Sequence, residues 1–121
     1  MKNNFIPVSD GNKKLNAPID RIKYVHANGA YATICMLDGK QYYKSWRIGV
    51  IDKYVKHSKL FFRSHESALV NILCVNWLEP PLPKTLPMID GTHQLLAKRN
   101  KKTYKEIKAQ MTAGITLLEK L

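Results

Sequence analysis

Phe61-Phe62-Arg63-Ser64-His65-Glu66-Ser67-Ala68-Leu69-Val70-Asn71 is the stretch of this sequence that is most informative about its fold. An extended apolar run over Leu60–Arg63 is followed by short polar residues and then by the apolar run Leu69–Leu78. The second run contains Val, Ile, Trp and Leu, which are favoured on buried strands. We therefore predict an extended segment over 60–63 and one well-buried strand over 69–78.

A series of short strands is predicted before this stretch. Turn signals and one short helical turn near 19–21 separate them, and they cover Phe5–Val8, Lys13–Leu15, Ile22–His26, Tyr31–Leu37 and Gln41–Lys44. The strand over 31–37 is apolar at odd and even positions, so we expect both of its faces to be covered. The turns Asp10-Gly11 and Asp38-Gly39 suit tight hairpins because glycine tolerates a positive φ.

Helical periodicity is found at two places. From Trp46 to Lys56 apolar residues recur on one face, which predicts a short amphipathic helix. A last hairpin is predicted with strands at 88–89 and 92–97, after a proline-rich loop. The segment over about 103–121 is predicted to be a C-terminal helix whose apolar face ends in Ile115, Leu118 and Leu121.

These elements together predict a mostly β, antiparallel fold with helical additions. The 121 residues fit a single domain over 1–121, with a core over about 5–108. Trp46 and Trp77 are expected in the core, because large aromatic side chains contribute much of the apolar area that a domain buries.

The charge balance points to a polyanionic partner. Lys and Arg number 20 against 9 Asp and Glu, a formal net charge of +11. No apolar stretch is long enough to span a membrane and no signal peptide is visible, so we expect a cytoplasmic protein that does not bind membranes. Basic residues gather near the C-terminal helix, at Lys98, Arg99, Lys101, Lys102, Lys105 and Lys108.

The sequence offers little support for catalysis or metal binding. Cys35 and Cys74 have aliphatic neighbours and are predicted to be buried free thiols. The four histidines are scattered without paired ligand spacing, so we predict no metal site and no cofactor. Phosphate-binding glycine loops, nucleophile elbows and H-E-x-x-H motifs are missing, and we predict no catalytic residue and no enzyme activity.

Two motifs resemble those of the LytTR DNA-binding domain of bacterial response regulators. Residues 61–71 fit the pattern F-x-R-x-H-x-S-x-L-V-N at every fixed position, and residues 24–31 fit Y-[IV]-x-A-x-G-x-Y. The resemblance spans roughly Phe5–Lys108. It implies an elongated, antiparallel, β-sandwich-like fold with a short central helix, and a transcription regulator without a receiver domain in this chain.

The resemblance also implies a partner, double-stranded promoter DNA with repeated sites, and the way in which the protein binds it. Three loops enter successive major grooves, and the residues carried over by motif are Asn28, Tyr31, His65, Glu66, Arg99 and Asn100. The neighbouring lysines Lys98, Lys101 and Lys102 are expected to contact phosphates, which adds affinity that depends on salt but not on base sequence.

Several implied contacts have a simpler interpretation that the sequence leaves open. Arg99 matches guanine bidentately but is also one more cation in a basic run. His65 is expected to be partly buried, and Tyr31 begins an apolar strand, so a core position is equally open for it. Glu66 either accepts a hydrogen bond from cytosine N4 or faces away. Asn71 is interpreted as a structural cap.

Two other functions remain as alternatives. An RNA-binding module needs exposed aromatic side chains on a sheet, and Tyr42 and Tyr43 are the candidates. A protein-interaction module would use the end of the C-terminal helix. The oligomeric state stays open, with a weak homodimer on DNA as one option.

Overall fold

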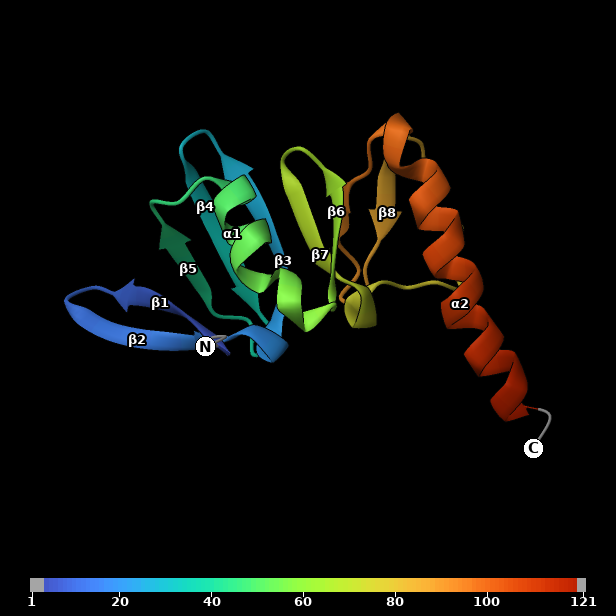
Figure 1. Ribbon diagram of the computed structural model, residues 1–121, viewed down its shortest axis with the longest axis horizontal. Helices are drawn as coiled ribbons and strands as arrows, with labels where there is room; N and C mark the ends of the chain where they lie inside the picture. Colours follow the sequence, from blue (N-terminus) through green and yellow to red (C-terminus); the bar gives the residue numbers. More distant parts are fainter. Residues whose placement is uncertain (1–3, 120–121) are drawn as a thin grey trace.

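The computed structural model describes residues 4–119, with side chains over 4–113 (Figure 1). Within these residues the strands form three antiparallel sheets. A ribbon pairs β1 (Phe5–Asp10) with β2 (Lys13–Pro18), and a hairpin pairs β8 (Thr85–Pro87) with β9 (His93–Leu95). The central sheet has the order β5-β4-β3-β7-β6, namely Gln41–Lys44, Tyr31–Met36, Ile22–Asn28, Ala68–Asn71 and Phe61–His65.

One helix lies over the central sheet and the other at one end of this elongated arrangement (Figure 1). Helix α1 (Ile48–Val55) covers the central sheet and α2 (Lys101–Glu119) lies beyond the β8–β9 hairpin (Figure 1). Short 3₁₀ turns lie between these elements at η1 (Ile19–Arg21), η2 (Lys56–Ser58), η3 (Ile72–Cys74) and η4 (Lys98–Asn100). The predicted mostly β fold with a short central helix and a C-terminal helix is confirmed. Helix α2 begins at Lys101 rather than at 103, and the side chains of Ile115, Leu118 and Leu121 lie outside the described residues.

Two apolar cores lie on opposite faces of the central sheet. The first joins that sheet to α1 and to the β1–β2 ribbon, with Ile34 and Ile51 fully buried in it. The second joins the other face to the β8–β9 hairpin and α2, and contains Cys35 and Trp77. Strand β4 therefore has both faces covered, as predicted. Trp77 is buried and Trp46 packs partly buried against the first core, so both are core aromatics.

The predicted single strand over 69–78 is wrong. Strand β7 ends at Asn71, whose buried amide nitrogen donates to the Ile22 carbonyl oxygen at 2.9 Å. The Asn71 amide oxygen accepts from the Leu73 backbone N–H at 2.9 Å, which caps η3. The Trp77 indole then donates to the Ile72 carbonyl at 2.8 Å. Beyond Asn71 the chain buries Cys74, Val75 and Trp77 through a turn and an irregular connection, whereas Leu73 and Leu78 are exposed.

The last hairpin also differs from its predicted bounds. Its strands are 85–87 and 93–95, whereas Met88 forms an isolated bridge with Val75. Ile89, predicted as strand, lies in the turn and is exposed. The turn at Asp90-Gly91 is confirmed, with a φ of +88° at Gly91.

Cys35 and Cys74 are buried free thiols, as predicted. Burial raises the pKa of both thiols, which keeps them protonated and weakly reactive at neutral pH. Among the described residues, no helix has the length and apolar character needed to cross a membrane.

Candidate nucleic-acid interface

Three connections lie in a row at one end of the sheets. The first loop (Asn28–Tyr31) joins β3 to β4, the second loop (His65–Ser67) joins β6 to β7, and the third loop (Ala97–Asn100) joins β9 to α2. Strand β3 pairs antiparallel with both β4 and β7, so the first two loops share an end of the sheet. Figure 1 shows all three along the upper edge of the molecule.

Backbone hydrogen bonds hold these loops next to one another. The Ala27 N–H, just before the first loop, donates to the Ser67 carbonyl oxygen of the second loop at 2.9 Å. The Ala97 N–H of the third loop donates to the Ser64 carbonyl oxygen, just before the second loop, at 2.8 Å. The loops named by the sequence motifs are thus brought together by the fold, although they lie far apart in the chain.

The first loop is a tight turn with exposed side chains. Gly29 has a φ of +68°, a conformation that a residue with a Cβ rarely adopts. Asn28 is exposed and Tyr31 is 58% exposed, so the alternative that places Tyr31 in the core is wrong. Both side chains are accessible to a partner at this edge.

The second loop presents one fixed and one free side chain. His65 is half-buried, as expected, and its Nδ1 accepts from the Ser67 backbone N–H at 3.0 Å. That bond makes Nε2 the proton-bearing nitrogen of the neutral ring. Glu66 is exposed, and only its backbone carbonyl oxygen has a hydrogen bond among the described residues.

The third loop carries cations and is fixed by Asn100. Lys98 and Arg99 are exposed on η4, and Lys101 and Lys102 are exposed on the first turn of α2. The Asn100 amide nitrogen donates to two backbone carbonyl oxygens of β6, those of Arg63 at 3.2 Å and Ser64 at 3.0 Å. The Asn100 side chain is therefore engaged within the protein, and it fixes the loop that carries Arg99.

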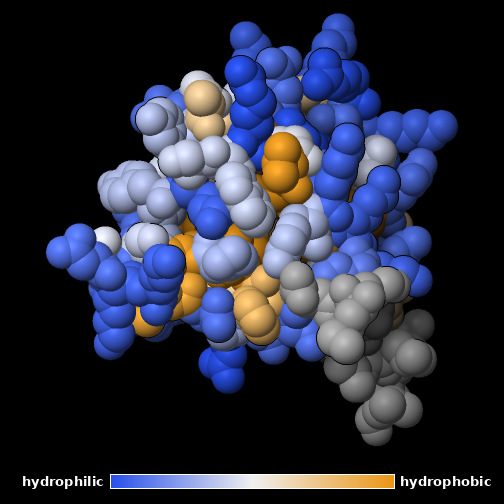
Figure 2. Space-filling view, turned by 60° about the vertical axis from the view of Figure 1, so that its left-hand side comes forward, coloured by the Kyte–Doolittle hydropathy of each residue, from blue (hydrophilic) through white to orange (hydrophobic). Residues whose placement is uncertain are grey.

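The charge at this edge is mostly positive. The three loops and the start of α2 contain Lys98, Arg99, Lys101 and Lys102 against the single acid Glu66. In Figure 2 hydrophilic side chains dominate the upper end of the visible face, and most of the strongly hydrophobic surface lies lower down. A clustered positive field over exposed polar loops favours a polyanion such as a nucleic-acid backbone.

The opposite end of the molecule carries aspartates. Strand β3 begins there, and the Leu37 N–H after β4 donates to the Arg21 carbonyl oxygen at 2.8 Å. Asp20 lies in η1 and Asp38 in the β4–β5 turn, whereas Asp90 pairs with Lys23 at 3.0 Å. These aspartates therefore lie at the end of the strands away from the three loops.

Comparison with known proteins agrees with this geometry. The family model of the LytTr DNA-binding domain matches residues 12–109. The chain belongs to the LytTR family. A solved structure, the LytTr DNA-binding domain of a methyl-accepting/DNA response regulator from Bacillus cereus, superposes with a TM-score of 0.69. It is 14% identical and covers 87% of this chain and 96% of its own length, which supports the shared fold. No curated protein sequence matches the chain.

The structure of this LytTR domain adds one basic residue that sequence reasoning missed. Lys84 lies with His65 and Lys98 around a shallow groove of about 320 Å³ between the second and third loops. It has a φ of +64°, and its carbonyl oxygen accepts from the Leu96 N–H at 2.9 Å. Nothing in the proline-rich segment predicts that position, because it follows from the pairing of β8 with β9.

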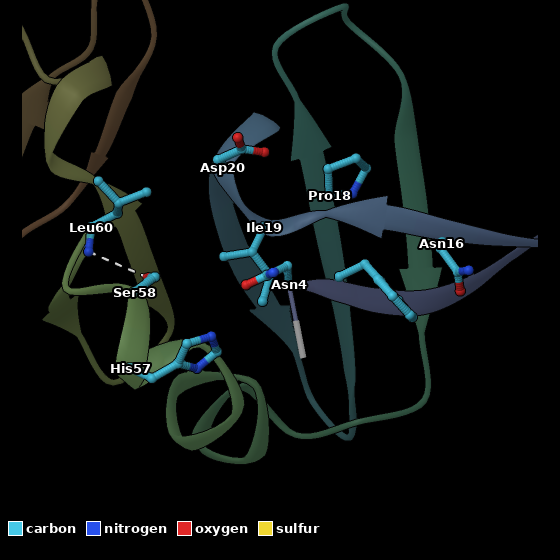
Figure 3. A pocket seen from close by; sticks show the side chains of 9 residues that line it. Asn4, Asn16, Pro18, Ile19, Asp20, His57, Ser58 and Leu60 are labelled. Atoms are coloured by element: carbon cyan, nitrogen blue, oxygen red, sulfur yellow. Dashed lines mark hydrogen bonds between the residues drawn. The ribbon is translucent and has the colours of Figure 1, made fainter. Parts of the chain in front are cut away.

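A separate hollow of about 450 Å³ lies away from the loops (Figure 3). Asp20 of η1 and His57 of η2 line it from the two elements that precede β3 and β6. The Ser58 hydroxyl beside it accepts from the Leu60 N–H at 3.3 Å. Since β3 and β6 begin here and end at the loops, this hollow does not belong to the LytTR interface.

Proposed function

We propose that this LytTR domain is a sequence-specific regulator of transcription that contacts bases in the major groove of double-stranded DNA through its three loops. The observation that carries this proposal is the row of exposed loops at one edge, with four cations and one acid. A B-DNA major groove admits protruding elements of this size, and each base pair shows a distinct donor and acceptor pattern there.

Base contacts are assigned to the exposed loop side chains. Arg99 offers a planar fork that matches O6 and N7 of guanine. His65 donates through Nε2, and Glu66 accepts from the N4 amino group of cytosine. Asn28 and Tyr31 contact bases from the first loop. Asn100 contributes through its position next to Arg99, since its amide nitrogen is bonded to β6.

Phosphate contacts are assigned to the lysines that flank the third loop. Lys98, Lys101 and Lys102 are exposed within a few residues of Arg99. Contacts of this type orient the protein on the duplex and release counterions, so they strengthen binding without base preference. We further propose promoter DNA with repeated sites as the target in a bacterial cytoplasm, with a weak homodimer formed on DNA.

The RNA-binding alternative finds little support in the structure. Tyr42 packs partly buried against the first core, which leaves Tyr43 as the exposed aromatic of β5. Single-stranded RNA is commonly bound by aromatic side chains that stack on two or three bases of an open sheet. Here both faces of the central sheet are covered by other elements of the domain at β3, β4 and β7, and Tyr43 lies on the edge strand β5.

A binding titration of Arg99→Ala tests the proposal. Against a duplex selected for binding, the variant is expected to lose about 1–3 kcal/mol of discrimination over a scrambled duplex, with little change in the slope of log affinity against log salt. The control Lys102→Ala is expected to weaken binding to both duplexes alike and to reduce that slope by about 1. Equal discrimination by Arg99→Ala and the wild type would contradict base contact by Arg99.

A further inference from the structure

Strand β6 contains one residue more than its partner strand across the same stretch. Phe62 pairs with Val70 and His65 with Ala68, so three steps along β6 match two steps along β7. This β-bulge places Arg63 and Ser64 outside the regular pairing with β7. Bulges of this kind free backbone groups and redirect side chains, so the partners of these two residues show what the bulge does.

The freed carbonyl oxygens hold the third loop. Both accept from the Asn100 amide nitrogen, Arg63 O at 3.2 Å and Ser64 O at 3.0 Å, and Ser64 O also accepts from the Ala97 N–H at 2.8 Å. The buried Ser64 hydroxyl donates to the Leu95 carbonyl oxygen at 2.7 Å. Every one of these bonds joins the bulge to the segment 95–100 that leads to and includes Arg99.

The Arg63 side chain holds the second loop in the same way. Its Nε donates to the His65 carbonyl oxygen at 3.0 Å and its Nη2 to the Glu66 carbonyl oxygen at 2.7 Å. Its Nη1 lies 3.3 Å from Oδ2 of Asp52 on α1. One guanidinium thus joins the backbone of the second loop to the helix that covers the first core.

We propose that the Arg63-Ser64 bulge fixes the second and third loops relative to each other, and that Arg63 and Asn100 are positioning residues for base recognition. This inference rests on the function proposed above. Base contacts require side chains to be held within about half an ångström of their productive position. The bulge constrains both loops in this way, because two adjacent residues form hydrogen bonds that point in several directions.

The geometry favours arginine over lysine at position 63. The planar guanidinium presents donors in a rigid fork and meets three acceptors at once, whereas an ammonium group is a point charge on a flexible stem. Arg63→Lys keeps the positive charge but loses the simultaneous bonds to His65 O and Glu66 O. The substitution therefore separates a positioning role from a phosphate contact, in which the charge is what matters.

The test compares affinity for a selected duplex with affinity for a scrambled duplex, across salt concentrations, for the full chain. Arg63→Lys is expected to lower the ratio of the two affinities about fivefold or more, because at least one base contact is lost. Its affinity for the scrambled duplex and its salt slope should stay unchanged. The matched control is Arg47→Lys at the exposed residue before α1, which is expected to keep the ratio. Thermal unfolding of each variant is followed in parallel.

Asn100→Ala is the second variant and decides the matter if Arg63→Lys does not fold. It removes the two side-chain hydrogen bonds to the bulge and leaves the Ala97 hydrogen bond in place. In a selection from random duplexes, the variant is therefore expected to lose its preference at the bases contacted by Arg99. It should keep its preference at the bases contacted by the first loop. An unchanged ratio in both variants would overturn the inference, as would a parallel loss on both duplexes with a smaller salt slope. If the wild type itself shows no preference, the proposed function fails first.

Discussion

Individual polar side chains with several partners stabilise the turns of this domain. Asp90 is the clearest case, since its Oδ1 accepts from the Thr92 N–H at 2.9 Å and from the Thr92 hydroxyl at 2.6 Å. Its Oδ2 accepts from Lys23 at 3.0 Å and from the Tyr24 hydroxyl at 3.3 Å. Burial would raise the pKa of Asp90, but the hydrogen bonds from Thr92 and Lys23 outweigh burial and hold it at about 2.

Asp90→Asn is expected to destabilise the fold by about 1 kcal/mol at pH 7, because the ion pair with Lys23 is lost and the pair is partly exposed. The folded pKa lies below the usual value of 3.8, so the carboxylate stabilises the fold above about pH 4 and loses this effect as the pH falls to about 2. Urea unfolding from pH 7 to pH 2 should show the two stabilities converge. Asp20→Asn at the same end controls for net charge, and a gap that is constant with pH would contradict the assignment.

At the scale of elements, local signals predicted most of the strands correctly. Alternation and Asp-Gly or Asn-Gly turns depend on a few adjacent residues, so the hairpins around 10–11, 38–39 and 90–91 were predictable. The strand over 69–78 was not, because the same apolar residues suit a strand and a strand that ends in a 3₁₀ turn equally well. What decides between them is the Asn71 side chain and its partner Ile22, which is distant in sequence.

Asn71→Ala is expected to destabilise the domain by about 2–4 kcal/mol. The substitution removes a buried hydrogen bond, leaves the Ile22 carbonyl oxygen without that partner and removes the cap of η3. Urea unfolding at neutral pH measures the loss. Asn76→Ala, which removes a similar but exposed cap on the Leu78 N–H, should cost about 1 kcal/mol or less. Equal losses in the two variants would show that the buried bond of Asn71 contributes little.

The candidate site was also predictable only in part, because local motifs place its loops but not the contacts between them. The two motifs and the basic run placed the loops in the sequence, and the strand order brought them to one edge. The role of Asn100 could not be predicted from the sequence. Its acceptors are carbonyl oxygens that a β-bulge leaves out of strand pairing, and that bulge depends on the register of β6 and β7. Base contact by the individual loop residues stays a prediction.

At the scale of the whole molecule, exposed cations lie close to the three loops, and the nearest acid there is Glu66. Lys98, Lys101 and Lys102 lie at the edge of the three loops, whereas Asp20 and Asp38 lie at the other end. A duplex that approaches the loop edge meets the cations first, and each phosphate neutralised releases counterions. Affinity should therefore depend on salt through this edge rather than through the net charge alone.

The triple variant K98A/K101A/K102A is expected to reduce the slope of log affinity against log salt by about 3, near 0.9 for each phosphate contact. Lys13, Lys14 and Lys40 are exposed elsewhere on the molecule, so the variant K13A/K14A/K40A has the same net charge and serves as its control. Titrations of both variants against one duplex from low to moderate salt measure the two slopes. Equal reductions would mean that net charge, not the loop edge, determines binding.

Entry of the three loops into the major groove is tested most directly by methylation interference on a selected duplex. Dimethyl sulfate modifies guanine N7, which faces the major groove, and adenine N3, which faces the minor groove. The proposed arrangement predicts that methylated guanines interfere with binding in two or more clusters of base pairs. These clusters should be spaced roughly one helical turn apart, in successive major grooves. Interference confined to adenine N3, or absent at every guanine, would contradict it.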